Sequence, residues 1–222
     1  MRVNNTVIFG ALVAVGLLIG GYLLFLRPGP EPVVPEPEQS VDGDASQGEA
    51  VPGDLPGPYL KIEVAGQANG TITIDLFEQN APKHVAQISQ LATDGFYNGV
   101  YFHRVIDGFM AQTGDGQFAK VEGGDMRRAG MGGSSLPNIE AEFSDISFER
   151  GIVGMARAQS ENSANSQLFI MFAPGDFLDG KYTVVGKVTE GMDVVDAIKL
   201  GEGQNGSVIG EPDRMVSVVV TE

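Results

Sequence analysis

The feature that most limits what this chain can fold into is a change in composition near residue 58. Residues 28–58 contain eight prolines, seven acidic residues and no basic residue. A stretch with so little apolar surface and so much like charge cannot form a core, so we expect a disordered, partly polyproline linker. Only residues 59–222 are left to build a globular domain, and their length suits a single one.

The segment before the linker is apolar. Residues 7–26 carry no charge, and Arg2 and Arg27 flank them. A helix needs about 20 apolar residues to cross a membrane. A cleaved signal peptide has a shorter apolar region followed by a small-x-small site, which is missing here, so an uncleaved anchor is favoured. We expect a transmembrane anchor at 1–27, a linker at 28–58, and a globular domain at 59–222 on the periplasmic or extracytoplasmic side.

Charge and residue counts exclude several kinds of function. The formal net charge is −15, which argues against a nucleic-acid-binding surface. The chain has no cysteine and two histidines, so thiol chemistry and metal sites built from cysteines or several histidines are excluded. We expect neither a metal nor any other cofactor.

The patterning of residues 59–222 predicts a mainly β domain. Apolar and polar residues alternate on either side of an Asn69-Gly70 turn, as in a hairpin with one buried face. Further short strands are predicted at 151–155, 168–172, 183–188 and 215–221. Many short strands with two helices are typical of a closed antiparallel barrel with helices over its ends.

Two amphipathic helices are expected. One begins at Pro82 and ends near Gly95, and the other covers residues 192–200. His84 lies off the apolar stripe of the first helix, so we expect it at the solvated surface.

One stretch combines strand patterning with polar chemistry. Residues 101–115 read Y-F-H-R-V-I-D-G-F-M-A-Q-T-G-D. Residues 100–106 are rich in β-branched and aromatic side chains, as in a half-buried strand, and Asp107-Gly108 is a turn signal before a second apolar run. Arg104 lies inside the first run, where its charge is costly unless it faces a wet groove or a partner. From these residues alone, an outward-facing arginine on a barrel strand is an equally good interpretation.

Three blocks, in order, resemble the signatures of cyclophilin-type peptidyl-prolyl isomerases. The first is F-H-R-V-I-D-G-F-M-A-Q-T-G-D at residues 102–115. The second joins M-A-R at 155–157 to N-S-Q-L-F-I at 165–170, and the third is F-L-D-G-K-Y-T-V-V-G-K-V at 177–188. The resemblance extends over residues 59–222. It implies an eight-stranded antiparallel barrel capped by two α-helices, and an isomerase that assists folding by rotating X-Pro bonds.

The resemblance also implies roles for individual residues. Arg104 matches the family arginine that donates to the prolyl nitrogen, so it is the predicted catalytic residue. The predicted substrate-binding residues are Phe109, Met110, Gln112, Ala156, Arg157, Gln167, Phe169, Phe177, Leu178 and Tyr182. No cysteine or G-x-S-x-G motif offers a nucleophile, which fits a reaction without a covalent step. Without the three blocks, Met110 and Phe169 would be assigned to ordinary core.

Some positions depart from the commonest family pattern. Phe177 stands where many members have tryptophan and Tyr182 where many have histidine. We therefore expect isomerase activity with weakened cyclosporin binding. Arg157 replaces an asparagine and is a frequent alternative, and none of the departures removes a catalytic donor.

Two other functions stay open at this point. A binding or chaperone module would use the groove to hold proline-containing polypeptides, although it would have no need of Arg104. An assembly scaffold would depend on the membrane helix and the linker instead. The expected partners are proline-containing clients and, through the N-terminal helix, a membrane.

Overall fold

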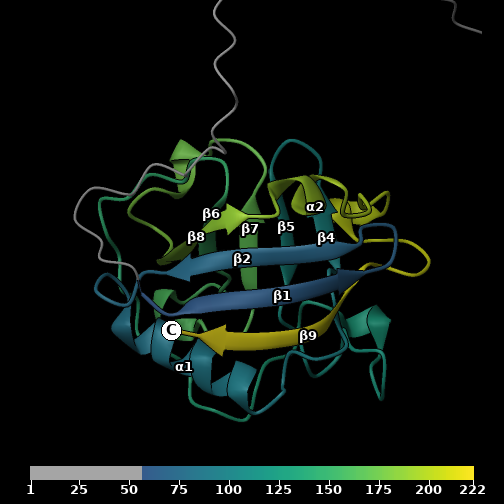
Figure 1. Ribbon diagram of the computed structural model, residues 1–222, viewed down its shortest axis with the longest axis horizontal. Coiled ribbons are helices and arrows are strands. Elements are labelled where there is room, and N and C mark those ends of the chain that lie inside the picture. Colours follow the sequence, from purple (N-terminus) through teal and green to yellow (C-terminus); the bar gives the residue numbers. More distant parts are fainter. Residues whose placement is uncertain (1–56) are drawn as a thin grey trace, which may run out of the picture. The chain divides into compact units, whose positions relative to one another are not determined.

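Nine strands form a single sheet in the computed structural model, which describes residues 57–222 (Figure 1). The strands are β1 (Tyr59–Ala65), β2 (Gly70–Leu76), β3 (Val100–Tyr101), β4 (Arg104–Ile106), β5 (Met110–Thr113), β6 (Ile152–Met155), β7 (Leu168–Met171), β8 (Val184–Glu190) and β9 (Arg214–Thr221). Their order across the sheet is β3-β9-β1-β2-β8-β6-β7-β5-β4, and all neighbouring pairs are antiparallel. The prediction of a mainly β domain is confirmed.

β1 and β2 form the predicted hairpin. Leu60 is paired with Ile74, and Ile62 with Ile72, and all four side chains are buried. Side chains alternate between the two faces of a strand, so the polar residues between them point away from this core. β9 pairs with the other edge of β1 and extends the same core.

The strand count differs from the expected eight because residues 100–106 are not one strand. β3 ends at Tyr101 and β4 begins at Arg104. Between them, the Phe102 N–H donates to the Asp213 carbonyl, and the His103 carbonyl accepts from the Val208 N–H. β3 pairs with β9 and β4 pairs with β5, which are at opposite ends of the strand order. The sheet therefore curls so far that its two edge strands, β3 and β4, are connected by only Phe102 and His103. Closure of the sheet into a barrel by hydrogen bonds between its edge strands stays a prediction.

Two α-helices accompany the sheet. α1 (Pro82–Thr93) has proline in its first turn and runs alongside β9 (Figure 1). α2 (Met192–Asp196) is shorter than the predicted 192–200, because the Lys199 N–H donates to the Asp213 carboxylate at 2.7 Å instead of extending the helix. The short 3₁₀ helices are η1 (Met126–Arg128), η2 (Glu161–Ser163), η3 (Asp176–Leu178) and η4 (Gln204–Gly206).

The expectation that His84 is a surface residue is wrong. Its side chain is fully buried, and Nδ1 lies 2.6 Å from the Glu142 carboxylate. Glu142 also accepts the backbone N–H groups of Lys83 and His84, so it caps the start of α1. The expectation that His84 lies off the apolar stripe is also wrong, because it is four residues before Ile88 and seven before Leu91 and shares their buried face. Its polar partner, Glu142, lies 58 residues away in the sequence.

The predicted transmembrane anchor and almost all of the predicted linker fall in residues 1–56, outside the described part of the chain. Within residues 57–222, every helix is too short or too polar to cross a membrane.

Candidate active site

Three strands bring predicted site residues onto one face of the sheet. β4 and β5 form a hairpin in which Arg104 is paired with Gln112. β7 pairs with β5, so that Gln112 lies opposite Phe169. Because side chains alternate along a strand, Met110 points to the same face as Gln112. This face therefore presents a cation, an amide, a thioether and an aromatic ring together.

A cavity of about 300 Å³, which we name the Phe169 cavity, opens here. It is lined by Arg104, Phe109, Met110, Gln112, Ala156, Arg157, Phe169, Phe177, Leu178 and Tyr182. These are all the residues predicted for the site except Gln167, which lines a neighbouring cavity. The structure thus brings the predicted set together, while the roles of its members in binding and catalysis stay predictions.

Aromatic rings build the wall of the Phe169 cavity. Phe169 is buried and stacks on Phe148 at 5.7 Å between ring centroids, and Tyr182 meets it edge-on at 5.9 Å. Phe109 packs against Phe177 at 5.4 Å, but Phe177 is 61% exposed. The wall therefore has a buried side fixed by packing and a solvent-exposed rim.

The Arg104 guanidinium is held at the edge of this cavity. Its Nε donates to the Asn205 carbonyl at 2.9 Å, and Nη2 donates to Asn205 Oδ1 at 3.2 Å. Nη1 donates to Gln112 Oε1 at 3.1 Å and lies 3.8 Å from the Met110 sulfur. Burial lowers the pKa of Arg104 from its ordinary value, yet an arginine stays charged at neutral pH.

Sequence reasoning missed Asn205 as a site residue. Its φ of 57° lies in the left-handed region, which asparagine tolerates better than most residues. The Asn205-Gly206 pair is a recognisable turn signal. Nothing in the sequence, however, indicates that this turn lies beside Arg104, 101 residues earlier.

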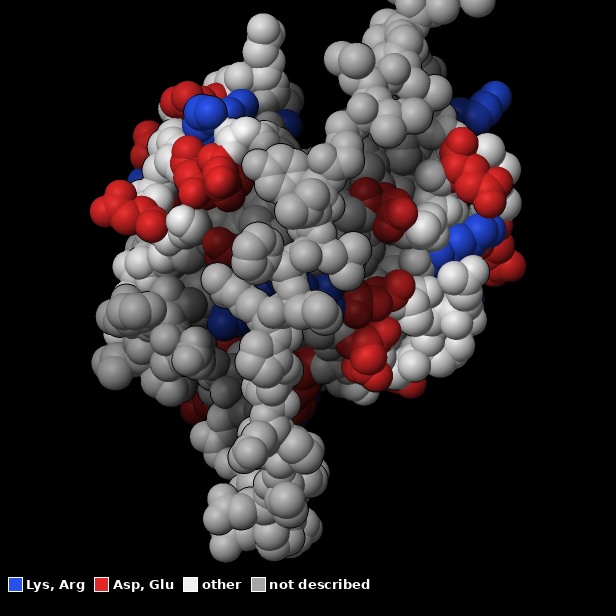
Figure 2. Space-filling view, turned by 90° about the horizontal axis from the view of Figure 1, so that it is seen from above, with Lys and Arg blue, Asp and Glu red and all other residues white. Residues whose placement is uncertain are grey.

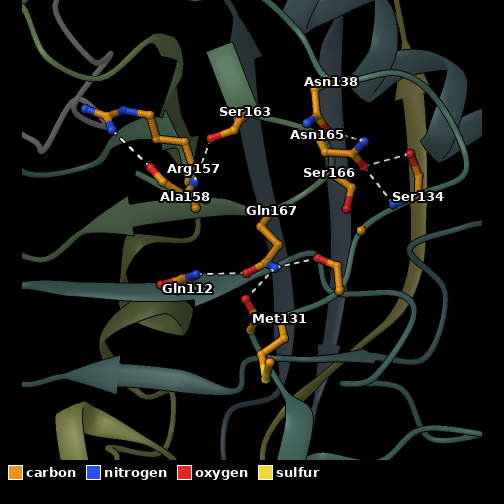
Figure 3. Close-up of a pocket in the computed structure, with 14 residues that line it drawn as sticks. Gln112, Met131, Ser134, Asn138, Arg157, Ala158, Ser163, Asn165, Ser166 and Gln167 are labelled. Atoms are coloured by element: carbon orange, nitrogen blue, oxygen red, sulfur yellow. Dashed lines mark hydrogen bonds between the residues drawn. The ribbon is translucent and has the colours of Figure 1, made fainter. Parts of the chain in front are cut away.

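A second cavity of about 340 Å³, named here the Asn165 cavity, shares Gln112, Ala156 and Arg157 with the first. Figure 3 shows its lining residues. Gln112 Nε2 donates to Gln167 Oε1 at 2.9 Å, and Gln167 Nε2 donates to the carbonyls of Gly132 and Gly130 at 2.7 and 3.0 Å. Asn165 Oδ1 accepts from the backbone and side chain of Ser134. A continuous chain of side-chain amides therefore connects Arg104 to the loop at residues 130–134.

The buried carboxylate of Asp115 supports this loop. Oδ2 accepts the N–H groups of Gly130 and Gly132 at 2.8 and 3.0 Å. Oδ1 accepts those of Gln117 and Phe118 at 3.1 and 2.8 Å. Four backbone donors thus surround one fully buried acid, and the loop that borders both Gln167 and the Asn165 cavity is fixed by it.

His103, next to Arg104, is 4% exposed, and burial lowers its pKa to about 4. In the unfolded chain His103 binds a proton near pH 6.5, whereas in the folded chain it binds one only near pH 4. The free energy of unfolding therefore falls as the pH falls through this range. We expect His103 to remove about 3 kcal/mol from the free energy of unfolding between pH 7 and pH 4.

The measurement is urea unfolding of the wild type and His103→Gln at pH 7, 6, 5 and 4, followed by near-ultraviolet circular dichroism. The variant should lose less stability on acidification by about this amount, because carboxylates titrate alike in both proteins. Parallel pH profiles would contradict the assignment to His103.

Across residues 57–222, no three histidine or acidic side chains lie close enough together to hold an ion.

Comparison with known proteins places this site in a family. The model of the family described as cyclophilin type peptidyl-prolyl cis-trans isomerase/CLD matches residues 59–220. A protein of Brucella suis biovar 1 (strain 1330), named "Probable peptidyl-prolyl cis-trans isomerase", is 56% identical over 154 residues, which are 68% of this chain and 78% of the relative. Peptidyl-prolyl cis-trans isomerase-like 1 of Mus musculus is 34% identical over 160 residues, 69% of this chain and 87% of that protein.

Solved structures show the same fold. A cyclophilin from Hirschia baltica superposes with a TM-score of 0.59 at 27% identity, covering 75% of this chain and 74% of the other. A cyclophilin-type isomerase of Cryptosporidium parvum, solved in the presence of the dipeptide Ala-Pro, superposes with a TM-score of 0.61 at 23% identity, covering 74% and 99%. The chain belongs to the cyclophilin-type peptidyl-prolyl cis-trans isomerases.

Proposed function

We propose that the Phe169 cavity binds the proline ring of an X-Pro segment while Arg104 donates a hydrogen bond to the prolyl nitrogen. The observation that carries this is a guanidinium fixed at the edge of an aromatic cavity by Asn205 and Gln112. A guanidinium has five N–H donors, and the four contacts of Arg104 leave one for a substrate.

The chemistry needs no covalent step. Rotation about an X-Pro bond has a barrier of about 18–20 kcal/mol, because the nitrogen lone pair is delocalised into the carbonyl group. A donor aimed at that nitrogen localises the lone pair and weakens the partial double bond. One charge-assisted hydrogen bond contributes about 1.5–3 kcal/mol, so the rest of the acceleration comes from how the cavity holds the twisted amide.

Holding the amide requires contacts on both sides of the rotating bond. Phe109, Met110 and Leu178 enclose the proline ring on one side. On the other, the Gln112 side chain is fixed at both ends, since Oε1 accepts from Arg104 and Nε2 donates to Gln167. The second hydrogen of its Nε2 is left for a substrate carbonyl.

The test is the rate of cis-to-trans isomerisation of a short Ala-Pro peptide with the full-length chain in a mild nonionic detergent. We expect the rate to rise in proportion to protein concentration above the uncatalysed rate. Binding of the peptide without any acceleration would replace the isomerase with a module that only holds proline-containing segments.

We also propose that residues 7–26 anchor the isomerase in a membrane, with the domain on the extracytoplasmic side and flexible proline-containing chains as its clients. The support is the uncharged run of 20 residues and the proline- and acid-rich segment that follows it. A flexible linker of that length spans on the order of 30 Å. Alkaline extraction should leave the chain in membranes, and protease added from the periplasmic side should digest its domain; a domain protected from that protease would reverse the orientation.

Cyclosporin should bind weakly, because the Phe169 cavity is lined by the exposed Phe177 and the partly buried Tyr182. A phenylalanine offers neither the indole N–H nor the larger ring of tryptophan. We expect Phe177→Trp to tighten inhibition of peptide isomerisation by cyclosporin at least about tenfold, the effect of one additional hydrogen bond of about 1.4 kcal/mol. Equally tight inhibition of both proteins would show that this position does not set the affinity.

A further inference from the structure

The charges that line the groove are all positive. Arg104 and Arg157 are the only charged side chains that line the Phe169 and Asn165 cavities in the described part of the chain. A third cavity of about 730 Å³ adjoins Arg104, and its fully charged residues are Arg104 and Arg127. The chain as a whole carries a formal net charge of −15, and Figure 2 shows acidic side chains prevailing on the face seen from above. A cationic groove thus lies in an acidic molecule.

Arg157 is the charge that joins two of these cavities. It lines both the Phe169 cavity and the Asn165 cavity, together with Gln112 and Ala156. A proline seated in the Phe169 cavity therefore places a neighbouring residue of the same segment over Arg157. Arg104 is engaged by Asn205 and Gln112, so Arg157 is the cation available to a side chain at that position.

The Arg157 guanidinium is held in place. Nη1 donates to the carbonyls of Ala158 and Gln159 at 3.1 and 3.3 Å, and Nη2 donates to the carbonyl of Lys181 at 3.1 Å. Its Cζ lies 4.6 Å from the centroid of the Tyr182 ring, in a cation–π contact. None of these partners is a carboxylate, so the positive charge is oriented without being neutralised.

Its hydrogen-bonding capacity is also incomplete. The three bonds use three of its five N–H donors. Nε has no partner but is buried, so the second hydrogen of Nη2 is the donor left for a ligand. A fixed guanidinium with unused donors favours carboxylate or phosphate oxygens over neutral acceptors.

We propose that Arg157 determines substrate specificity by selecting proline segments that carry a carboxylate side chain within two residues of the target proline. This inference rests on the proposed function, because it assumes that the proline occupies the Phe169 cavity. The net negative charge of the chain opposes an anionic segment at long range, so the selection depends on close contact between the carboxylate and the Arg157 guanidinium. Segments with lysine at the same position meet Arg157 as a like charge.

The experiment compares matched peptides on the full-length chain in nonionic detergent. Each contains one X-Pro bond and carries Glu, Gln or Lys at one of the two positions before or the two positions after proline. Both kcat/KM for isomerisation and Kd for binding are measured, for wild type, Arg157→Asn and Arg150→Asn. Arg150 is a matched control, because it is an exposed arginine paired with Asp196 that lines none of the three cavities.

At one of the four positions, we expect wild type to favour Glu over Gln about two- to fivefold in Kd, the size of an exposed ion pair, and to disfavour Lys. This preference should shrink as ionic strength rises. Arg157→Asn should abolish the Glu-to-Gln ratio, and Arg150→Asn should retain it. A purely structural role of Arg157 would change the values for all peptides in proportion and leave the ratio intact.

Two results overturn the inference: equal Kd values for Glu and Gln peptides at all four positions, or a preference that persists in Arg157→Asn. Failure of the proposed function looks different. Peptides that bind with the expected ratio but are not isomerised would retain Arg157 as the specificity residue and remove the enzyme. Peptides that are isomerised with equal Kd values for Glu and Gln would retain the enzyme and remove Arg157 as the specificity residue.

Discussion

Replacing Arg104 by alanine should lower kcat/KM for X-Pro isomerisation about 10- to 150-fold, the effect of losing one charge-assisted hydrogen bond of about 1.5–3 kcal/mol. The loss should fall mainly on kcat, because the bond to the prolyl nitrogen strengthens only as the lone pair localises in the twisted state. Peptide affinity should change much less, since the aromatic wall of the Phe169 cavity is untouched.

A second substitution at the same position separates charge from geometry. Arg104→Lys keeps the positive charge but cannot reach Asn205 and Gln112 with one planar fork. We expect it to lose nearly as much activity as Arg104→Ala. Arg150→Ala is the matched control and should keep full activity. If Arg104→Lys retained wild-type kcat, the acceleration would come from positive charge near the proline rather than from an oriented hydrogen-bond donor.

Asn205 fixes the orientation of the Arg104 guanidinium. Both its carbonyl and its side-chain oxygen accept from the Arg104 guanidinium. The left-handed conformation at Asn205 is what presents both acceptors to the same side chain. The predicted catalytic residue, Arg104, is thus positioned by a turn that belongs to another part of the chain.

The predictable part of the site is the part that is local in sequence. Arg104, Phe109, Met110 and Gln112 all belong to one hairpin, so the turn signal and the strand alternation already decide which side chains share a face. The family resemblance supplied the predicted roles of these residues and added Phe169, Phe177 and Leu178 from two other segments. The register Gln112–Phe169 confirms that β7 meets β5, and Phe177 and Leu178 line the same cavity as Phe169.

The part that sequence could not predict depends on contacts between distant segments. The carboxylate that contacts the His84 ring lies 58 residues away, and the acceptors of Asn205 that orient Arg104 lie 101 residues away. Local patterning carries no information about such partners. The break between β3 and β4 has the same origin, because the backbone at Phe102 and His103 bonds to Asp213 and Val208 rather than to a neighbouring strand.

Asp115→Asn should be the most destabilising isosteric change at this site. An amide keeps one oxygen and turns an NH₂ group towards the two backbone N–H groups that the other oxygen accepted. Two hydrogen bonds to a charged acceptor are lost in a fully buried place, and two donors are left unsatisfied. We expect the free energy of unfolding to fall by about 3–5 kcal/mol.

The measurement is urea unfolding of the full-length protein in nonionic detergent, monitored by near-ultraviolet circular dichroism, with hydrogen exchange of the loop amides. Exchange at Gly130 and Gly132 should accelerate even where the rest of the domain stays protected, because Asp115 is their acceptor. Asp94→Asn makes the same chemical change at a surface carboxylate whose one side-chain partner within residues 57–222 is Gln90, and should alter stability by less than about 0.5 kcal/mol. If the two variants were equally stable, the loop would be held by Gln167 and the chain of amides that leads to Arg104, and Asp115 would be dispensable for both the fold and the groove.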